Sequence, residues 1–317
     1  MSLAVAFAGA PVAAQADANA GSTPDAAAAP AAILRSTHAI AGWQVLVDER
    51  LFAAERPATE RALELLGQML AEIVRVVPGP AVAALRAVPL YVSPAYPGQR
   101  SGAEYHPGAG WLRDHGRDPA MARCVEFSGV ADFEREMQRM PNFALHELAH
   151  AYHDRVLTRG FANPAVLRAY EQAKADGRYA RVERWHGPAR PTTVEPAYAL
   201  TSAMELFAEG TEAFFTRNDF APFTRAELQA HDPALCALLA RLWGVDAADP
   251  AAMASDAPTP TPTPTPLPAP MGAPASAPPA NDRGAAVDGP FAMLALGSTL
   301  VVLLVLRARR RRRAAAR

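Results

Sequence analysis

The segment PNFALHELAHAYHDR, residues 141–155, decides how this chain is interpreted. Its apolar residues recur at helical spacing, and Pro141 suits the first turn of a helix. We therefore predict one helix from Pro141 to about Thr158. Within it His146 and His150 are four residues apart, so they lie one turn apart on one face, where two imidazole nitrogens can bind the same metal ion.

The residues beside the two histidines extend this pattern. Glu147 directly follows the first histidine, where its carboxylate can take a proton from water at the metal. Zinc lowers the pKa of bound water to about 7, and two histidines with one carboxylate form a common hydrolytic site with an open fourth position. An ordinary amphipathic helix with solvated His and Glu side chains is the competing interpretation. We expect His153 to be a neighbour on the helix rather than a further ligand.

A second segment, residues 198–212, supplies the candidates for a third ligand. Glu205, Glu209 and Glu212 fall at i, i+4 and i+7, so one face of a helix carries three carboxylates. On an apolar helix that is unfavourable unless a positive group lies opposite, and a metal ion would explain it. Ser202 and Glu205 also form a capping box, which would explain Glu205 without a metal. We favour Glu205 as the ligand, with Glu209 as a carboxylate that supports a histidine.

The two motifs together, HELAH at 146–150 and YALTSAMELFAE at 198–209, resemble the catalytic domain of anthrax lethal factor-like metallopeptidases, which belong to the gluzincins. The resemblance is strong only at these motifs. It implies that Glu205 is the third zinc ligand and that Glu209 is a supporting carboxylate. It also implies that Tyr198 donates its hydroxyl to the oxyanion or leaving group, and that Asp154 is a supporting residue.

These residues predict a zinc-dependent metallopeptidase that hydrolyses a peptide or protein substrate. His146, His150 and Glu205 would bind Zn²⁺, and Glu147 and Tyr198 would be catalytic. Two alternatives stay open: a non-catalytic, surface-anchored binding module on a zincin scaffold, and a zinc hydrolase of a non-peptide amide. A structural zinc site would need a fourth protein ligand, which the sequence does not clearly offer.

The rest of the central sequence predicts an α+β, zincin-like catalytic domain over residues 33–250, with a small sheet, an active-site helix and a mostly helical second half. Predicted strands are Trp43–Val47, Val88–Val92 and Cys124–Phe127, and predicted helices are Pro57–Val77, Phe133–Arg139, Pro164–Ala175, Ser202–Thr216 and Arg225–Trp243. One face of the first helix should carry Leu63, Leu66, Leu70, Ile73 and Val74. The strand at 124–127 is either a plain sheet edge or an edge that pairs with an extended peptide.

Two features inside this domain are less regular. Residues 96–123 are rich in Gly, Pro and His and predict a loop with little regular structure. Within it His106 could line a cleft, but we expect a solvent-exposed loop histidine. Cys124 and Cys236 are the two cysteines, and they either form a disulfide or remain two buried free thiols.

The two ends of the chain predict export and anchoring. Residues 1–16 resemble the apolar part of a signal peptide, and 17–32 a disordered lead. Residues 251–288 form a Pro/Thr/Ala-rich spacer, 289–306 an uncharged run long enough for a transmembrane helix, and 307–317 an arginine-rich cytoplasmic tail. We therefore expect an exported protein, anchored in the bacterial cell membrane with its catalytic domain outside. The same ending also resembles cleaved C-terminal sorting signals.

Charge excludes one class of partner. The formal net charge is −1, and seven arginines lie in the last eleven residues, so the rest of the chain is acidic. A nucleic-acid partner is not expected, because such surfaces are basic.

Overall fold

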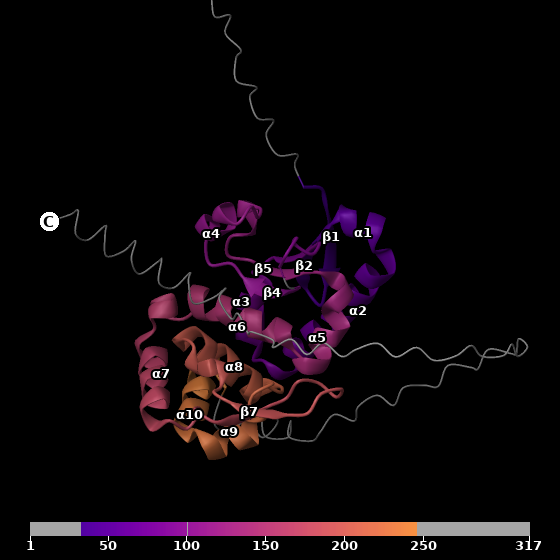
Figure 1. Cartoon of the computed structure of the whole chain (residues 1–317). Helices are drawn as coiled ribbons and strands as arrows, with labels where there is room; N and C mark the ends of the chain where they lie inside the picture. Colours follow the sequence, from indigo (N-terminus) through magenta and orange to yellow (C-terminus); the bar gives the residue numbers. More distant parts are fainter. Residues whose placement is uncertain (1–32, 100, 246–317) are drawn as a thin grey trace, which may run out of the picture. The chain divides into compact units, whose positions relative to one another are not determined.

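A computed structural model describes residues 33–99 and 101–245 (Figure 1). The strands are β1 (Arg35–Ile40), β2 (Trp43–Asp48), β3 (Leu90–Ser93), β4 (Gly102–Tyr105), β5 (Val125–Ser128), β6 (Val182–Arg184) and β7 (Thr193–Glu195). The α-helices are α1 (Glu49–Ala54), α2 (Arg56–Val76), α3 (Gly79–Arg86), α4 (Ala109–Asp114), α5 (Phe133–Arg139), α6 (Phe143–Arg155), α7 (Pro164–Asp176), α8 (Ala203–Phe215), α9 (Arg225–His231) and α10 (Pro233–Trp243). Short 3-10 turns include η4 (Tyr198–Leu200). The chain is therefore a mixed α+β protein, as the sequence predicts.

The expected membrane anchoring is wrong on the structural finding. In the part of the chain that the structure describes, no helix combines the length and the apolar character that crossing a bilayer requires. The run at 289–306 and the other predicted segments at 1–16, 17–32, 251–288 and 307–317 all lie outside the described residues.

The main sheet has five strands in the order β1-β2-β3-β5-β4. The three central strands are parallel, and the two outer strands, β1 and β4, are antiparallel to their neighbours. The predicted strand at 124–127 is β5, but it lies inside the sheet. The edge strands are β1 and β4, so the prediction of an edge at 124–127 is wrong. The edge next to β5 belongs instead to residues 102–105.

Residues 96–123 contain more regular structure than the sequence predicts. Strand β4 and helix α4 both fall within this segment. Each is only four to six residues long, which is too short for hydrophobic periodicity to reveal. Strand β4 exists because β5 offers it a backbone ladder from Gly102 to Tyr105, which is a tertiary effect.

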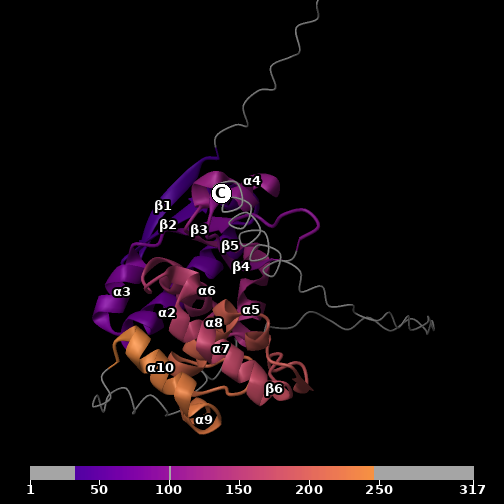
Figure 2. The same ribbon diagram turned by 90° about the vertical axis from the view of Figure 1, so that its left-hand side faces the viewer.

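Helix α2 covers the sheet together with α6. Leu66, Leu70 and Ile73 are buried, as the helical spacing predicts, and Leu65 and Met69 join them. Val74 is 40% exposed, so its placement on the buried face is wrong. Figure 2 shows α2 and α6 beneath the sheet, and the two helices contact each other. Helix α2 thus supports α6 from the side of the sheet.

The second half packs helices against α8, which contacts α6, α7, α9 and α10. All but one of the residues of α8 are buried. The predicted helix from Arg225 to Trp243 is two helices, separated at Asp232. Pro233 lacks a backbone N–H and begins a new helix, and the Asp232 carboxylate accepts the backbone N–H of Leu235 at 3.0 Å. Helix α8 is therefore the centre of this half, between α6 and the last helices.

The question of a disulfide is settled in favour of free thiols. Cys124 and Cys236 are both buried and unpaired with each other. Cys124 packs with Tyr91, Leu112 and Met121 between the sheet and α4, whereas Cys236 belongs to the large core. Burial raises the pKa of the Cys124 thiol to about 11, so this thiol is protonated and unreactive at neutral pH.

Candidate metal centre

Helix α6 carries the paired histidines and is fixed at its start by Asn142. The side-chain oxygen of Asn142 accepts the backbone N–H of Leu145 at 3.0 Å, and its amide donates to the carbonyl of Met69 in α2 at 3.1 Å. The helix therefore begins at Phe143, two residues later than predicted, and it ends at Arg155 rather than near residue 158. His146 and His150 lie on one face, as their spacing requires, with ring centroids 4.9 Å apart.

Helix α8 brings Glu205 to these rings. Ser202 caps the helix, because its hydroxyl accepts the backbone N–H of Glu205 at 3.2 Å. The Glu205 carboxylate does not complete a capping box and turns to the histidines instead. Its Oε2 lies 3.2 Å from Nε2 of His146 and 3.3 Å from Nε2 of His150. Thus one carboxylate oxygen meets two imidazole nitrogens, and all three residues are buried.

These separations fit ligands of one small ion. Four ligands about 2.0–2.1 Å from a tetrahedral zinc ion would be about 3.3 Å from one another. A charge-assisted hydrogen bond between an imidazole and a carboxylate is shorter, about 2.7–2.9 Å. The contacts at 3.2 and 3.3 Å therefore match the spacing between ligands better than a pair of strong hydrogen bonds. The group His146, His150 and Glu205 can hold a metal ion.

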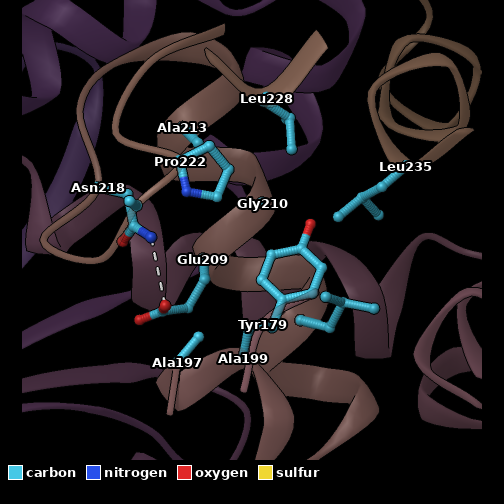
Figure 3. Close-up of a pocket in the computed structure, with 12 residues that line it drawn as sticks. Tyr179, Ala197, Ala199, Glu209, Gly210, Ala213, Asn218, Pro222, Leu228 and Leu235 are labelled. Carbon is cyan, nitrogen blue, oxygen red and sulfur yellow. Dashed lines mark hydrogen bonds between the residues drawn. The ribbon is translucent and has the colours of Figure 1, made fainter. Parts of the chain in front are cut away.

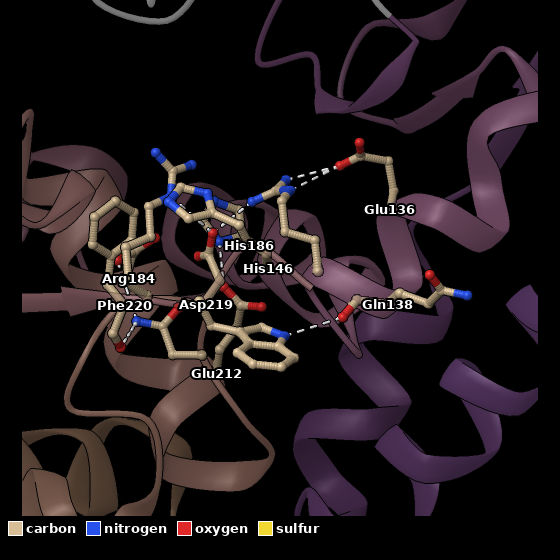
Figure 4. Close-up of polar contacts among 12 residues, drawn as sticks. Glu136, Gln138, His146, Arg184, His186, Glu212, Asp219 and Phe220 are labelled. Atoms are coloured by element: carbon tan, nitrogen blue, oxygen red, sulfur yellow. Dashed lines mark hydrogen bonds and ion pairs between the residues drawn. The ribbon is translucent and has the colours of Figure 1, made fainter. Parts of the chain in front are cut away.

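Glu212, and not Glu209, supports the first histidine. Nδ1 of His146 lies 2.7 Å from Oε2 of Glu212, which holds the ring so that Nε2 faces Glu205. Glu209 instead accepts a hydrogen bond from the Asn218 amide at 3.2 Å. Figure 4 shows His146 and Glu212 in the same polar network. The supporting role given to Glu209 from the resemblance is not what the hydrogen bonds show.

Glu209 also lines a small cavity beside α8. This cavity has a volume of about 10 Å³, close to the least space that holds one water molecule. Tyr179, Gly210 and Pro222 line it, and Asn218 reaches Glu209 at its rim (Figure 3). Glu209 therefore contacts the core around α8 as well as the metal centre.

The buried carboxylates differ in their affinity for protons. Burial would raise the pKa of Glu205, but His150 and His146 lower it well below its usual range. Burial raises the pKa of Glu212 to about 7 although His146 opposes the shift. Burial, with Asp219 and Glu212 nearby, also raises the pKa of Glu209 well above its usual value. Glu205 is thus the ionised member of the set, which is the form that binds a metal.

Glu147 lies beside His146 and His150 and against the edge strand β4. Its Oε2 accepts the backbone N–H of Tyr105, in β4, at 2.8 Å. Burial raises the pKa of Glu147, while the charges of His146 and His150 lower it in part. A carboxylate with a raised pKa beside metal ligands is suited to accept and return a proton.

Asp154 is linked to Glu147 through Tyr105. It accepts a hydrogen bond from the Tyr105 hydroxyl at 2.8 Å, and so holds the residue whose backbone binds Glu147. Among the described residues, no hydrogen bond joins Asp154 to His146 or His150. Nδ1 of His150 has no hydrogen-bond partner among these residues. Asp154 therefore contacts Tyr105 and not His150.

The site opens into a groove of about 1390 Å³, whose walls come from β4, α5, α6, α8 and the β6–β7 hairpin. Tyr198 lines this groove together with His146, Glu147, His150 and Glu205. His106 also lines it, but it is buried, with Nε2 at 2.8 Å from Glu126. The expectation of a solvent-exposed loop histidine is therefore wrong, because β4 places His106 beside β5.

His153 is a core residue and not a ligand. It is fully buried, with its ring 5.2 Å from that of Phe161 and 4.9 Å from that of Phe207. Burial lowers its pKa to about 3.

Sequence reasoning missed Tyr105, because only its backbone reaches Glu147, and it did not assign Glu212, although the i+7 spacing pointed to it. Comparison with protein-family models, curated proteins and solved structures found no match to this chain.

Proposed function

We propose that this protein is a zinc-dependent metallopeptidase of the gluzincin type, with a zincin-like fold. One observation carries the proposal: Oε2 of Glu205 lies 3.2 and 3.3 Å from the Nε2 atoms of His146 and His150. The two motifs that resemble lethal factor-like metallopeptidases supply these three residues. The α+β fold agrees with a zincin but is shared by many other proteins.

The donor set favours zinc over the hard cations. Two imidazole nitrogens and one carboxylate oxygen suit Zn²⁺, whereas Ca²⁺ and Mg²⁺ prefer oxygen ligands alone. Three protein ligands are typical of a catalytic zinc site, and four of a structural one. Among the described residues the group that meets at Glu205 has three members. This count supports an enzyme more than the non-catalytic binding module that the sequence left open.

Each residue at the site has a task in amide hydrolysis. A bound zinc ion would act as a Lewis acid and would lower the pKa of water, so that hydroxide is available for attack near neutral pH. Glu147 takes the proton from the attacking water and gives it to the leaving amine. The backbone N–H of Tyr105 holds the Glu147 carboxylate in place at 2.8 Å. Tyr198, in the groove wall, is the candidate donor to the oxyanion.

The edge strand supports a peptide as substrate. The backbone N–H of His106 donates to the carbonyl of Cys124, and the backbone carbonyl of His106 accepts from the N–H of Arg123. The backbone groups of His106 and of every second residue before it in β4 therefore point toward β5. Tyr105 alternates with His106, so its backbone N–H points away from β5 and donates to Glu147. Ala103 shares this outward direction, because alternate residues of a strand face the same side. An extended peptide in the groove can therefore pair with β4, as peptides do at exposed sheet edges.

The test combines metal analysis with cleavage. We expect the purified protein to hold one zinc ion and to cleave members of a defined pool of synthetic peptides, with both lost on chelation and restored by added zinc. Glu147→Gln should keep the zinc but lower kcat by about 10² or more, since proton transfer contributes about 10²–10⁴. Glu60→Gln, an exposed residue of α2, is the matched control and should behave as wild type.

Three results would count against the proposal. Full activity of Glu147→Gln would remove Glu147 from the mechanism. Cleavage that survives complete removal of metal would remove zinc. Bound zinc without cleavage of any peptide would favour a binding module or a hydrolase of a non-peptide amide.

A further inference from the structure

Arg184 ends strand β6 in the wall of the groove. Its side chain is 17% exposed, and its guanidinium carbon lies 4.5 Å from the ring centre of Phe220. Figure 4 shows Arg184 beside Phe220, with His186 and Asp219 in the same cluster. A largely buried arginine facing a substrate groove needs a partner for its charge, because burying an unpaired charge is costly.

Two carboxylates balance the charge of Arg184, but no hydrogen bond to another described residue uses its N–H donors. Asp219 lies 3.5 Å from its Nε and Glu195 lies 3.6 Å from its NH1. Neither contact is a hydrogen bond, and the buried Nε has no hydrogen-bond partner among the described residues. Arg139, in α5, donates instead to Glu136 and Asp219 at 2.6–3.1 Å. Arg184 therefore keeps donors that Arg139 has already used.

The backbone around Arg184 is held on both sides. Arg184 pairs with Thr193 in β7, and an isolated bridge joins it to Phe220. The next residue, Trp185, donates its backbone N–H to the carbonyl of Asp219 at 2.7 Å. A guanidinium with a fixed base and an aromatic platform loses little entropy when it binds a ligand.

We propose that Arg184 forms a subsite for a carboxylate of the substrate peptide, either an acidic side chain or the C-terminal carboxylate. This inference rests on the proposed peptidase function. A carboxylate accepts two parallel N–H groups from a guanidinium, which is the geometry that unused donors offer. Asp219 is 1% exposed and already accepts a hydrogen bond from Arg139. Glu195 is the other carboxylate near the guanidinium, and its contact at 3.6 Å is too long to occupy a donor.

The experiment measures specificity rather than activity alone. The full-length protein is assayed on paired peptides that differ by Glu or Gln at one position, each made with a free and with an amidated C-terminus. Arg184→Gln removes the charge, and Arg184→Lys keeps the charge but loses the planar fork. Arg181→Gln is the matched control, because Arg181 is exposed at the start of the same hairpin and outside the groove.

We expect wild type and Arg181→Gln to prefer Glu over Gln at one position, or a free C-terminus over an amide. Arg184→Gln should lower kcat/KM for the preferred peptides about tenfold or more, with little effect on their neutral partners, as loss of a charge-assisted hydrogen bond requires. A response of the Glu and Gln pair would identify an acidic side chain as the source of the carboxylate. A response of the free and amidated pair would identify the C-terminus. Cleavage without such a preference, or a preference that Arg184→Gln leaves intact, overturns the subsite and leaves the peptidase standing. Failure of wild type to cleave any peptide overturns the peptidase and the subsite with it.

Discussion

His153→Leu should make the protein more stable, and the gain should grow as the pH falls. His153 is 0% exposed, and neither ring nitrogen has a hydrogen-bond partner among the described residues. Leaving a buried polar group unpaired costs about 1–3 kcal/mol. Leucine is of similar volume and favours a helix, so it can fill the space between Phe161 and Phe207 without this cost.

The pH dependence follows from the two pKa values of the imidazole. In the folded protein burial lowers the pKa of His153 to about 3, whereas in the unfolded chain it is about 6.5. The unfolded state therefore binds the proton first as the pH falls, and His153 reduces stability progressively from about pH 6.5 to about pH 3. From pH 7 to pH 5 this loss amounts to about 2 kcal/mol. The leucine variant does not suffer it.

Urea unfolding of the full-length chain at pH 7 and pH 5, in the presence of a chelator, measures both effects. The other titrating groups are common to wild type and variant, so they cancel in the difference of unfolding free energies. His115→Leu, which removes an exposed imidazole, is the matched control for the loss of one histidine. A difference between wild type and His153→Leu that stays constant from pH 7 to pH 5 would refute the reasoning, because His153 would then be able to take up a proton in the folded state.

Two further predictions concern the support of the site. Glu212→Gln should weaken zinc affinity about 10–100-fold, measured by competition with a chelator, because Glu212 orients His146, whereas Glu209→Gln should weaken it less; equal losses would contradict the assignment of Glu212. Tyr105→Phe removes the hydroxyl that binds Asp154 and should lower the free energy of unfolding by about 1 kcal/mol in urea melts. Zinc content should be unchanged in Tyr105→Phe, and a loss of zinc would show that Asp154 acts on the ligands directly.

The sequence was most informative where helical spacing alone determines position. Helix α5 has the predicted bounds, and the i, i+4 relation of His146 and His150 appears in the structure as two rings on one face. It was least informative about short strands. Strand β4 has four residues and no alternation of its own, and its pairing with β5 could not be predicted from local sequence. With β4 missing, the sheet edge was assigned to β5, and the surroundings of His106 were predicted wrongly.

The choice between Glu209 and Glu212 shows how far helical geometry can go. Relative to Glu205, a residue at i+4 is turned by about 40° and a residue at i+7 by about 20° in the other direction, at 100° per residue. Both therefore lie on the face toward α6, and angle alone slightly favours Glu212. The distance along the axis is about 10 Å for i+7, so one histidine must reach two turns of α8 to contact both Glu205 and Glu212. The His146 ring does so because its two nitrogens point in opposite directions, with Nε2 toward Glu205 and Nδ1 toward Glu212. An imidazole bridging two turns of a facing helix is a property of the packing of α6 on α8, and only the structure could supply it.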